Sequence, residues 1–430
     1  MMVGSSRSRC RVRVLAQQVT AASEASAQAQ LLLPRAAPED VGLSKERLLR
    51  LDDFFRDAVS GRVSDGRPAQ KQCLAGCVLA VARHGRLCHS TVIGQRNLKA
   101  GAAMTEDTIF RIFSLTKIVT AVGVLQLYEQ GLFQLDDPIY KFIPTFKEAK
   151  VKRMEGVSSS EPLRQHVTIR HLFTHTSGLG PPSGLWPEAS LAEQVEILAK
   201  GPLEFQPGEG FLYGTSTDVL GRLIEILSGQ TLDRYFQAYI FQPLGMKDTS
   251  FWVPEEDAQR LATMYGTDKE GQLRPLEILE GVGSAPRFLS PGGGLVSTSA
   301  DFLRFGLMLA GKGALGPTRI LGRKTVELMT TNHMPRRQDV AGLGGTMPDF
   351  KTTRGLGCGL GVFVVLSPEF GVHCSEGTYF WQGVGSTYFF HDPVEALTVV
   401  AMAQFYPVYG EPVFNINFAL RSLTEQAIVD

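Results

Sequence analysis

Residues 110–146 read FRIFSLTKIVTAVGVLQLYEQGLFQLDDPIYKFIPTF, and the order of residue types in this stretch decides the fold. A β-prone run at Thr108–Phe113 overlaps its start, and Ser114 and Lys117 follow in S-x-x-K spacing. The apolar segment Thr116–Tyr128 contains no proline and ends close to a glycine, which is typical of a helix. The pattern therefore predicts a strand that leads into a helix, with Ser114 at the helix N-terminus.

A serine and a lysine in this arrangement can carry chemistry. A side chain at a helix N-terminus meets free backbone N–H groups and the positive end of the helix dipole. Lys117 lies one turn after Ser114 on the same helix face, so its amine can reach the hydroxyl. A lysine that is partly removed from water can lose its proton near neutral pH and act as a base. The alternative is that Ser114 only caps the helix and Lys117 is a solvated residue of its first turn.

Strand-like segments gather at the two ends of the chain, and helix-like segments lie in the middle. Leu74–Val81 and Leu87–Val92 flank a turn and predict a hairpin. Four strand-like runs follow residue 359, at Leu360–Leu366, Gly371–Cys374, Thr387–His391 and Leu397–Phe405. We therefore expect an α+β fold, in which a central antiparallel sheet is flanked by helices and a mainly helical lobe is inserted. The expected α/β domain comprises residues 36–130 and 287–430, and the expected helical lobe comprises residues 131–286.

Composition and charge exclude several classes of function. Hydrophobic residues make up 43% of the 430, and 43 basic residues balance 43 acidic ones. This balance, without a long basic run, argues against nucleic-acid binding. No apolar run reaches the roughly 20 residues that span a bilayer. His171 and His175 have i, i+4 spacing without an HExxH motif, and the six cysteines form no ligand set, so we expect neither a metal nor another cofactor.

The N-terminal segment differs from the rest of the chain. Residues 1–35 contain closely spaced arginines, several serines and no acidic residue before Glu24. This composition is typical of a transit peptide, which predicts a mitochondrion or plastid as the location. A disordered leader on a cytoplasmic protein is the alternative. In either case these residues are not expected to belong to the folded domain.

Residues 110–146 resemble the serine β-lactamase and penicillin-binding-protein superfamily, and within it the class C-like carboxylesterases of family VIII and related acyltransferases. Three further blocks resemble the same superfamily in the same order: Val167–Leu179 (VTIRHLFTHTSGL), Phe211–Gly229 (FLYGTSTDVLGRLIEILSG) and the glycine-rich Gly292–Met308. The resemblance extends from about Pro38 to the C-terminus and implies a β-lactamase/transpeptidase-like fold.

The resemblance also implies roles for individual residues. Ser114 corresponds to the family nucleophile, Lys117 to its base partner, and Tyr213 to the tyrosine that moves a proton between the serine and the leaving group. Thr215 replaces the asparagine of the usual Y-x-N pattern. Its hydroxyl can still donate a hydrogen bond, but its reach is shorter, which argues against amide substrates more than against acyl transfer.

The K-T-G motif of the family is replaced by Trp381-Gln382-Gly383. In β-lactamases the lysine supplies a cation that holds the substrate carboxylate. Tryptophan removes that cation and offers an apolar wall, as in the esterase variant of the family. Gly383 allows close approach of the substrate, and the backbone N–H of Val384, with that of Ser114, resembles the oxyanion hole.

These residues predict a serine hydrolase that cleaves small carboxylic esters through an acyl-enzyme on Ser114. An acyltransferase with the same acyl-enzyme is the first alternative, because the sequence does not decide between water and an acceptor alcohol. A non-catalytic, self-associating β-lactamase-like protein is the second. Trp381 disfavours a true β-lactamase, and the oligomeric state is left open.

Overall fold

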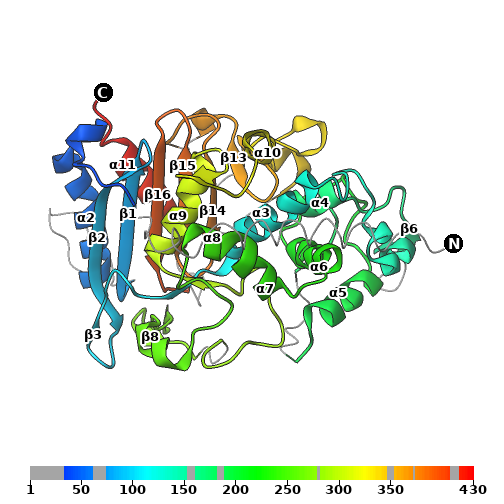
Figure 1. Ribbon diagram of the computed structural model, residues 1–430, viewed down its shortest axis with the longest axis horizontal. Coiled ribbons are helices and arrows are strands. Elements are labelled where there is room, and N and C mark those ends of the chain that lie inside the picture. The colour runs from blue at the N-terminus through cyan, green and yellow to red at the C-terminus, as the bar shows by residue number, and fades with distance from the viewer. Residues whose placement is uncertain are drawn as a thin grey trace.

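The fold is built on one large antiparallel sheet to which both ends of the chain contribute (Figure 1). The computed structural model describes residues 33–61, 74–152, 160–181, 188–277, 281–345, 353–370, 373–406 and 416–430. Residues 1–32 of the predicted leader lie outside the described residues, so its role and the location that it implies stay predictions.

The sheet has eight strands in the order β12-β13-β14-β15-β16-β1-β2-β3. Strand β1 (Gly76–Arg83) pairs with β16 (Leu397–Ala403) and, through the predicted hairpin, with β2 (Arg86–Asn97). Every residue of β1 and β16 is buried, so both faces of these strands are covered. The predicted α+β class with a central antiparallel sheet is confirmed. The other strands of the sheet are β3 (Ala102–Ala103), β12 (Leu356–Cys358), β13 (Phe363–Val365), β14 (Tyr379–Gly383) and β15 (Thr387–Asp392).

One predicted strand, Gly371–Cys374, lies partly outside the described residues, and another strand was not foreseen. The described residues of Gly371–Cys374 form no strand, and the strand of this region, β14, begins at Tyr379. A run of four residues carries too little periodicity to distinguish a strand from a loop. Strand β12 is only three residues long, and its neighbouring glycines suggest a turn rather than a buried strand.

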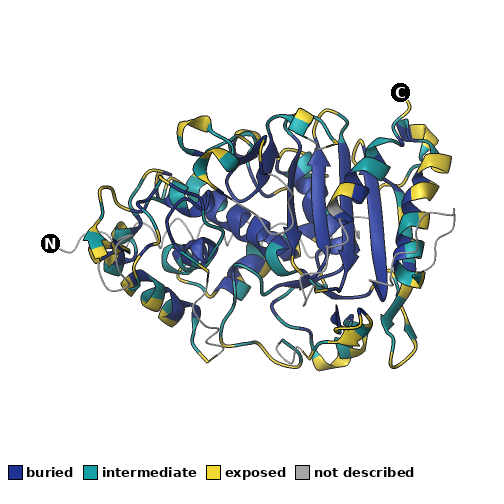
Figure 2. Ribbon diagram, turned by 180° about the vertical axis from the view of Figure 1, so that it is seen from behind, coloured by how far each residue is buried: buried dark blue, intermediate teal, exposed yellow. Residues whose placement is uncertain are grey.

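Helices cover the sheet, whose central strands are buried in Figure 2. Helix α2 (Lys45–Ser60) packs against β2 and against α11 (Ile416–Glu425). Helix α9 (Ser299–Ala310) packs against β1, β15 and β16. The N- and C-terminal helices thus lie side by side, which closes the α/β part of the molecule around strands from both ends of the chain.

The middle of the chain forms helices beside the sheet, at the right of Figure 1. Helix α3 (Thr116–Glu129) lies between them and the sheet, and its buried residues extend around most of its circumference, as expected for a central helix. Helix α6 (Ser216–Ser228) packs against α3. The expected domain boundaries stay predictions. Among the described residues, the remaining α-helices are α4 (Ile169–Phe173), α5 (Leu191–Lys200), α7 (Leu232–Phe236), α8 (Gln242–Leu244) and α10 (Arg323–Met329). The small strand pairs are β4 (Phe110–Arg111) with β9 (Val296–Ser297), β5 (Lys150–Lys152) with β6 (Ser160–Pro162), β7 (Tyr265–Thr267) with β8 (Leu273–Pro275), and β10 (Ala314–Leu315) with β11 (Thr318–Arg319).

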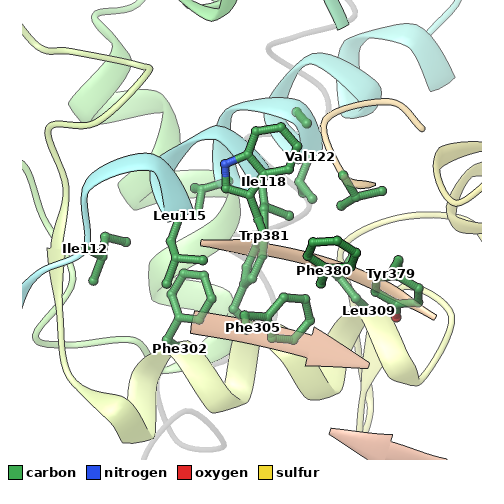
Figure 3. Close-up of a cluster of buried hydrophobic side chains, with 14 of the residues drawn as sticks. Ile112, Leu115, Ile118, Val122, Phe302, Phe305, Leu309, Tyr379, Phe380 and Trp381 are labelled. Carbon is green, nitrogen blue, oxygen red and sulfur yellow. The ribbon is translucent and has the colours of Figure 1, made fainter. Parts of the chain in front are cut away.

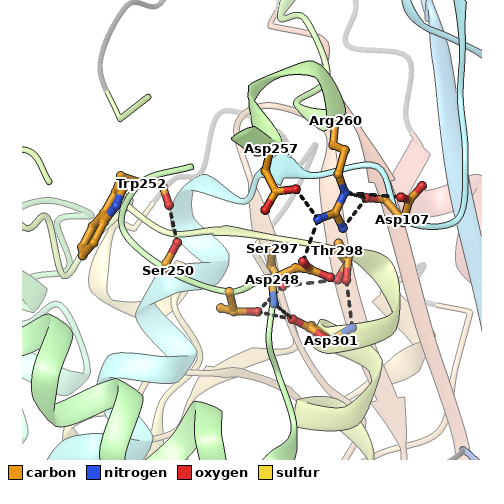
Figure 4. Close-up of polar contacts among 10 residues, drawn as sticks. Asp107, Asp248, Ser250, Trp252, Asp257, Arg260, Ser297, Thr298 and Asp301 are labelled. Atoms are coloured by element: carbon orange, nitrogen blue, oxygen red, sulfur yellow. Dashed lines mark hydrogen bonds and ion pairs between the residues drawn. The ribbon is translucent and has the colours of Figure 1, made fainter. Parts of the chain in front are cut away.

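A polar network holds the β4–β9 pair that precedes Ser114 (Figure 4). The Asp301 carboxylate accepts hydrogen bonds from the backbone N–H of Asp248 at 2.8 Å and from the Thr249 hydroxyl at 3.0 Å. Arg260 forms an ion pair with Asp248 at 2.9 Å. Because the Thr249 hydroxyl also lies 2.8 Å from the hydroxyl of Ser297 on β9, the network fixes the strand against which the nucleophile segment pairs.

Candidate active site

The proposed nucleophile lies in a strained turn ahead of α3. Ser114 is the central residue of the 3₁₀ turn Phe113–Leu115, which leads directly into the helix. Phe113 has a φ of 45°, in the left-handed region that bulky side chains avoid. Such strain persists only where the surrounding structure enforces it, and it is frequent at functional sites. Ser114 itself is partly exposed, whereas its neighbour Leu115 is buried.

Lys117 is buried against the nucleophile. Its side chain is 7% exposed, and its Nζ donates hydrogen bonds to the Oγ of Ser114 at 3.1 Å and to the carbonyl of Gly292 at 2.6 Å. The i, i+3 geometry expected from the S-x-x-K spacing is present. Lys117 is therefore not the solvated surface residue of the alternative reading, because it is buried and bonded to the serine hydroxyl.

The structure brings Tyr213 to the same pair. The Lys117 Nζ lies over the Tyr213 ring, 4.9 Å from its centroid. Tyr213 is partly exposed and precedes α6, so three residues from two distant parts of the chain meet here. A lysine over an aromatic face is held by the negative potential of the ring. The Ser114, Lys117 and Tyr213 side chains predicted as a group therefore lie together.

His175 packs behind the Tyr213 ring, a role that sequence reasoning did not find. Its ring centroid lies 4.9 Å from that of Tyr213, and its backbone φ is 54°. Burial, and to a smaller extent the charge of Lys117, lowers the pKa of His175 to about 3, so the imidazole is neutral at physiological pH. Its buried Nδ1 has no hydrogen-bond partner among the residues that the structure describes.

The histidine pair does not form a metal site in the described residues. The Nδ1 of His171 accepts a hydrogen bond from the backbone N–H of Thr168 as part of the α4 capping box. No group of three or more His, Cys, Asp or Glu side chains within the described ranges has an arrangement that could hold a metal ion. His171 thus stabilises the start of a helix, and His175 supports Tyr213.

The Trp381 side chain is buried. It is 2% exposed, stacks on Phe363 with centroids 4.5 Å apart, and lies 6.0 Å from Tyr213 by ring centroids. Figure 3 shows its indole against α3, next to Ile118. The side chain therefore forms an aromatic base under Tyr213 and His175, and it places no cation at position 381.

Gly383 and Val384 lie where β14 approaches the nucleophile turn. A Cβ added at Gly383 would lie 2.3 Å from the carbonyl oxygen of Ile112, so the absence of a side chain lets the strand pack against the segment that carries Ser114. Val384 is 41% exposed. This placement is compatible with the predicted oxyanion hole of the Val384 and Ser114 N–H groups, which stays a prediction.

The Thr215 hydroxyl forms a hydrogen bond within the protein. Its hydroxyl donates to the carbonyl of Gly180 at 3.1 Å, and the residue is 4% exposed at the N-terminus of α6. The bond ties α6 to the segment that follows His175. A direct hydrogen bond from Thr215 to substrate stays a prediction, and it would require this hydroxyl to change partner.

Asp218 is a further residue of the site that sequence reasoning missed. It lies in the first turn of α6 and is partly buried. Burial raises the pKa of its carboxyl to about 6, although the charge of Lys117 and the backbone N–H of Gly292 act in the opposite direction. The available signal was an acidic residue inside the tyrosine-bearing block FLYGTSTDVLG, but such an acid is common in a first helical turn.

The fold and the Ser–Lys–Tyr arrangement define a serine hydrolase of the β-lactamase-related class. A family model described as Beta-lactamase matches residues 52–412. The chain therefore belongs to the β-lactamase family. In the part of the chain that the structure describes, no helix is long and apolar enough to cross a membrane.

The relatives of this chain include esterases. Esterase EstB of Burkholderia gladioli is 31% identical over 391 residues, which are 82% of this chain and 89% of EstB. Among solved structures, EstCE1, described as a hydrolase with promiscuous acyltransferase activity, is 26% identical with a TM-score of 0.70, covering 88% of this chain and 99% of its own. Simvastatin synthase LovD from Aspergillus terreus is 22% identical with a TM-score of 0.73, covers 89% and 98% of the two chains, and is similar in fold.

Proposed function

We propose that the protein hydrolyses small carboxylic esters through an acyl-enzyme on Ser114. The observation that carries the proposal is the contact between the buried amine of Lys117 and the Ser114 hydroxyl, 3.1 Å apart, over the ring of Tyr213. A nucleophile, a base within hydrogen-bond reach and a group that supports the base are the parts that covalent catalysis needs.

The proposal includes the following sequence of proton transfers. Lys117 takes the hydroxyl proton of Ser114 while Oγ attacks the ester carbonyl, and the oxyanion forms on the N–H groups of Ser114 and Val384. The alkoxide leaves with the proton of the Tyr213 hydroxyl, and Lys117 returns its proton to Tyr213. Water then attacks the acyl-enzyme by the same route, which releases the acid and restores Ser114.

The absence of a cation at position 381 favours uncharged esters over penicillins. A penicillin carboxylate needs a positive partner at the site edge, and this position holds the buried indole of Trp381. The esterases among the relatives support the same substrate class. Efficient hydrolysis of penicillins would contradict this part of the proposal.

Acyl transfer is a second candidate, supported by the described activity of EstCE1. The same acyl-enzyme would be resolved by an alcohol in place of water. Product analysis in the presence of increasing concentrations of a short alcohol separates the two, because hydrolysis yields the free acid and transfer yields a new ester.

A panel of p-nitrophenyl esters tests the proposal. Wild-type protein should release p-nitrophenol, and Ser114→Ala should lose this turnover while keeping its fold by circular dichroism. Ser90→Ala, an exposed serine on β2, is the matched control and should remain fully active. Equal turnover by Ser114→Ala would contradict the proposal, and a folded wild type without any turnover would favour the non-catalytic alternative.

A further inference from the structure

Asp218 lies beside the Ser114–Lys117 pair, and the proton transfers described above give it no role. A Cβ placed on Gly292 would lie 3.2 Å from Asp218 Oδ1 and 3.4 Å from Lys117 Nζ. The two charged groups therefore meet at one glycine, whose carbonyl already accepts the hydrogen bond from Lys117. This contact joins α6, α3 and the glycine-rich turn at residues 292–294.

The charges around Asp218 are few. Lys117 on α3 is the charged side chain whose field acts on the carboxyl, and the turn contributes the backbone N–H of Gly292. The other titratable side chains of the site are Tyr213 and His175. Because His175 is neutral at physiological pH, the Asp218 carboxylate is the negative charge that can compensate a proton taken up by Lys117.

We propose that Asp218 is a positioning residue that stabilises the ammonium form of Lys117 while Ser114 attacks the ester. The inference rests on the proposed esterase function. Lys117 gains a positive charge when it takes the hydroxyl proton, in a place from which water is largely excluded. A nearby carboxylate compensates that charge as it forms, so it lowers the barrier to attack.

Asp218 exchanges no proton in this step. The O–H bond of Ser114 breaks, its proton passes to Nζ of Lys117, the Oγ–carbon bond forms, and the carbonyl electron pair moves to oxygen. The carboxylate keeps its charge throughout and acts on the reaction through Lys117. The arrangement gives the site a nucleophile, a base and an acidic side chain that supports the base.

A purely structural role for Asp218 makes different predictions. An acidic side chain in the first turn stabilises a helix by interacting with its dipole, whatever lies nearby. Asp233 has such a position in the first turn of α7 and belongs to no part of the site described above. Asp233→Asn is therefore the matched control for Asp218→Asn, since both changes remove a first-turn charge and keep the shape of the side chain.

The pH dependence of ester turnover tests the proposal. At pH 8 the kcat of Asp218→Asn should be about 10- to 100-fold below that of the wild type, as expected for loss of a charge a few ångströms from the developing ammonium. Since the pKa of Asp218 is about 6, the wild-type carboxyl becomes neutral as the pH falls through this value. The ratio of wild-type to variant kcat should therefore shrink toward pH 5, and Asp218→Glu should restore most of the pH dependence.

The ratio of wild-type kcat to the kcat of Asp233→Asn should stay close to one at every pH. A wild-type to Asp218→Asn ratio that is constant from pH 5 to pH 9, or equal losses in the two variants, would overturn the role of Asp218. If Asp218→Asn does not fold, as judged by its thermal transition, Asp218→Ser replaces it in the same comparison. Labelling of Ser114 by a fluorophosphonate separates the two proposals, since an unlabelled, inactive wild type contradicts the esterase function itself.

Discussion

A Cβ at Gly383 would lie 2.3 Å from the carbonyl oxygen of Ile112. The Thr387 hydroxyl donates a hydrogen bond to the same carbonyl at 3.0 Å. Ile112 immediately precedes the turn that carries Ser114. A glycine in the sheet therefore sets the distance between β14 and the nucleophile, which links the W-x-G segment to the S-x-x-K segment through backbone contact.

Replacing this glycine should disturb the site more than the fold. We expect Gly383→Ala to lower the free energy of unfolding by about 1–3 kcal/mol, as overpacking does. Because the added methyl displaces the turn of Ser114, kcat/KM should fall by about 100-fold. Urea unfolding and ester kinetics measure the two effects. Gly201→Ala, where a Cβ would meet its nearest neighbour at 3.4 Å, is the control and should change neither quantity appreciably.

Removal of the proposed base should abolish turnover without unfolding the protein. Lys117→Met keeps the length of the side chain and should reduce kcat by about 10²- to 10⁴-fold, the usual contribution of a general base. The protein should stay folded, with a lower thermal midpoint, because the Gly292 carbonyl loses the hydrogen bond from Lys117. The exposed Lys147→Met is the control. A Lys117→Met protein with wild-type kcat would show that another group accepts the serine proton.

His175 should make the folded state sensitive to acid. Its pKa is about 3 in the folded protein and near 6.5 in an unfolded chain. Between these values the unfolded chain binds a proton that the folded protein does not, so stability present above pH 6.5 is lost as the pH falls. The titration of His175 should lower the free energy of unfolding by about 2 kcal/mol between pH 7 and pH 5.

His175→Asn removes this titration, and asparagine tolerates the positive φ at position 175. Urea unfolding of both proteins at pH 5, 6, 7 and 8 should show a shallower pH dependence for the variant, whatever its stability at pH 8. Parallel curves would mean that His175 is not buried as a neutral imidazole.

The lysine of the β-lactamase K-T-G motif cannot simply be restored at position 381. Trp381→Lys places an ammonium where the indole is 2% exposed and stacked on Phe363. We expect a loss of at least about 3 kcal/mol of stability and no gain of penicillin hydrolysis. Trp381→Phe, which keeps an aromatic ring, should lose much less stability. Calorimetry and a penicillin hydrolysis assay check both points, and a stable lysine variant with penicillinase activity would contradict them.

The parts of the site that are local in sequence could be predicted. Ser114 and Lys117 are three residues apart, so one helical turn brings them together once the apolar helix is recognised. The strands β1 and β16 were equally clear, because each is a long apolar run buried over its whole length. Local pattern and burial agree in these elements, and the prediction succeeded for that reason.

The remaining parts depend on contacts between distant residues. Lys117 is bonded to Gly292, 175 positions away, and the packing of α6 against α3 brings Asp218 to the proposed base. His175 lies in a positive-φ turn and acts by packing under Tyr213, which no periodicity indicates. The motif predicted an apolar side chain at Trp381, but the stacking of Phe363 on its indole depends on a contact that the sequence does not indicate.

The most direct test of the account is mass spectrometry of the protein during turnover of a p-nitrophenyl ester. Quenching in acid within the first turnovers should trap an adduct with the mass of the acyl group, and peptide mapping should place it on Ser114. Ser114→Ala should carry none. An acyl group on any other side chain, or ester turnover without a trapped adduct on rapid quenching, would contradict the assignment of Ser114 as the nucleophile.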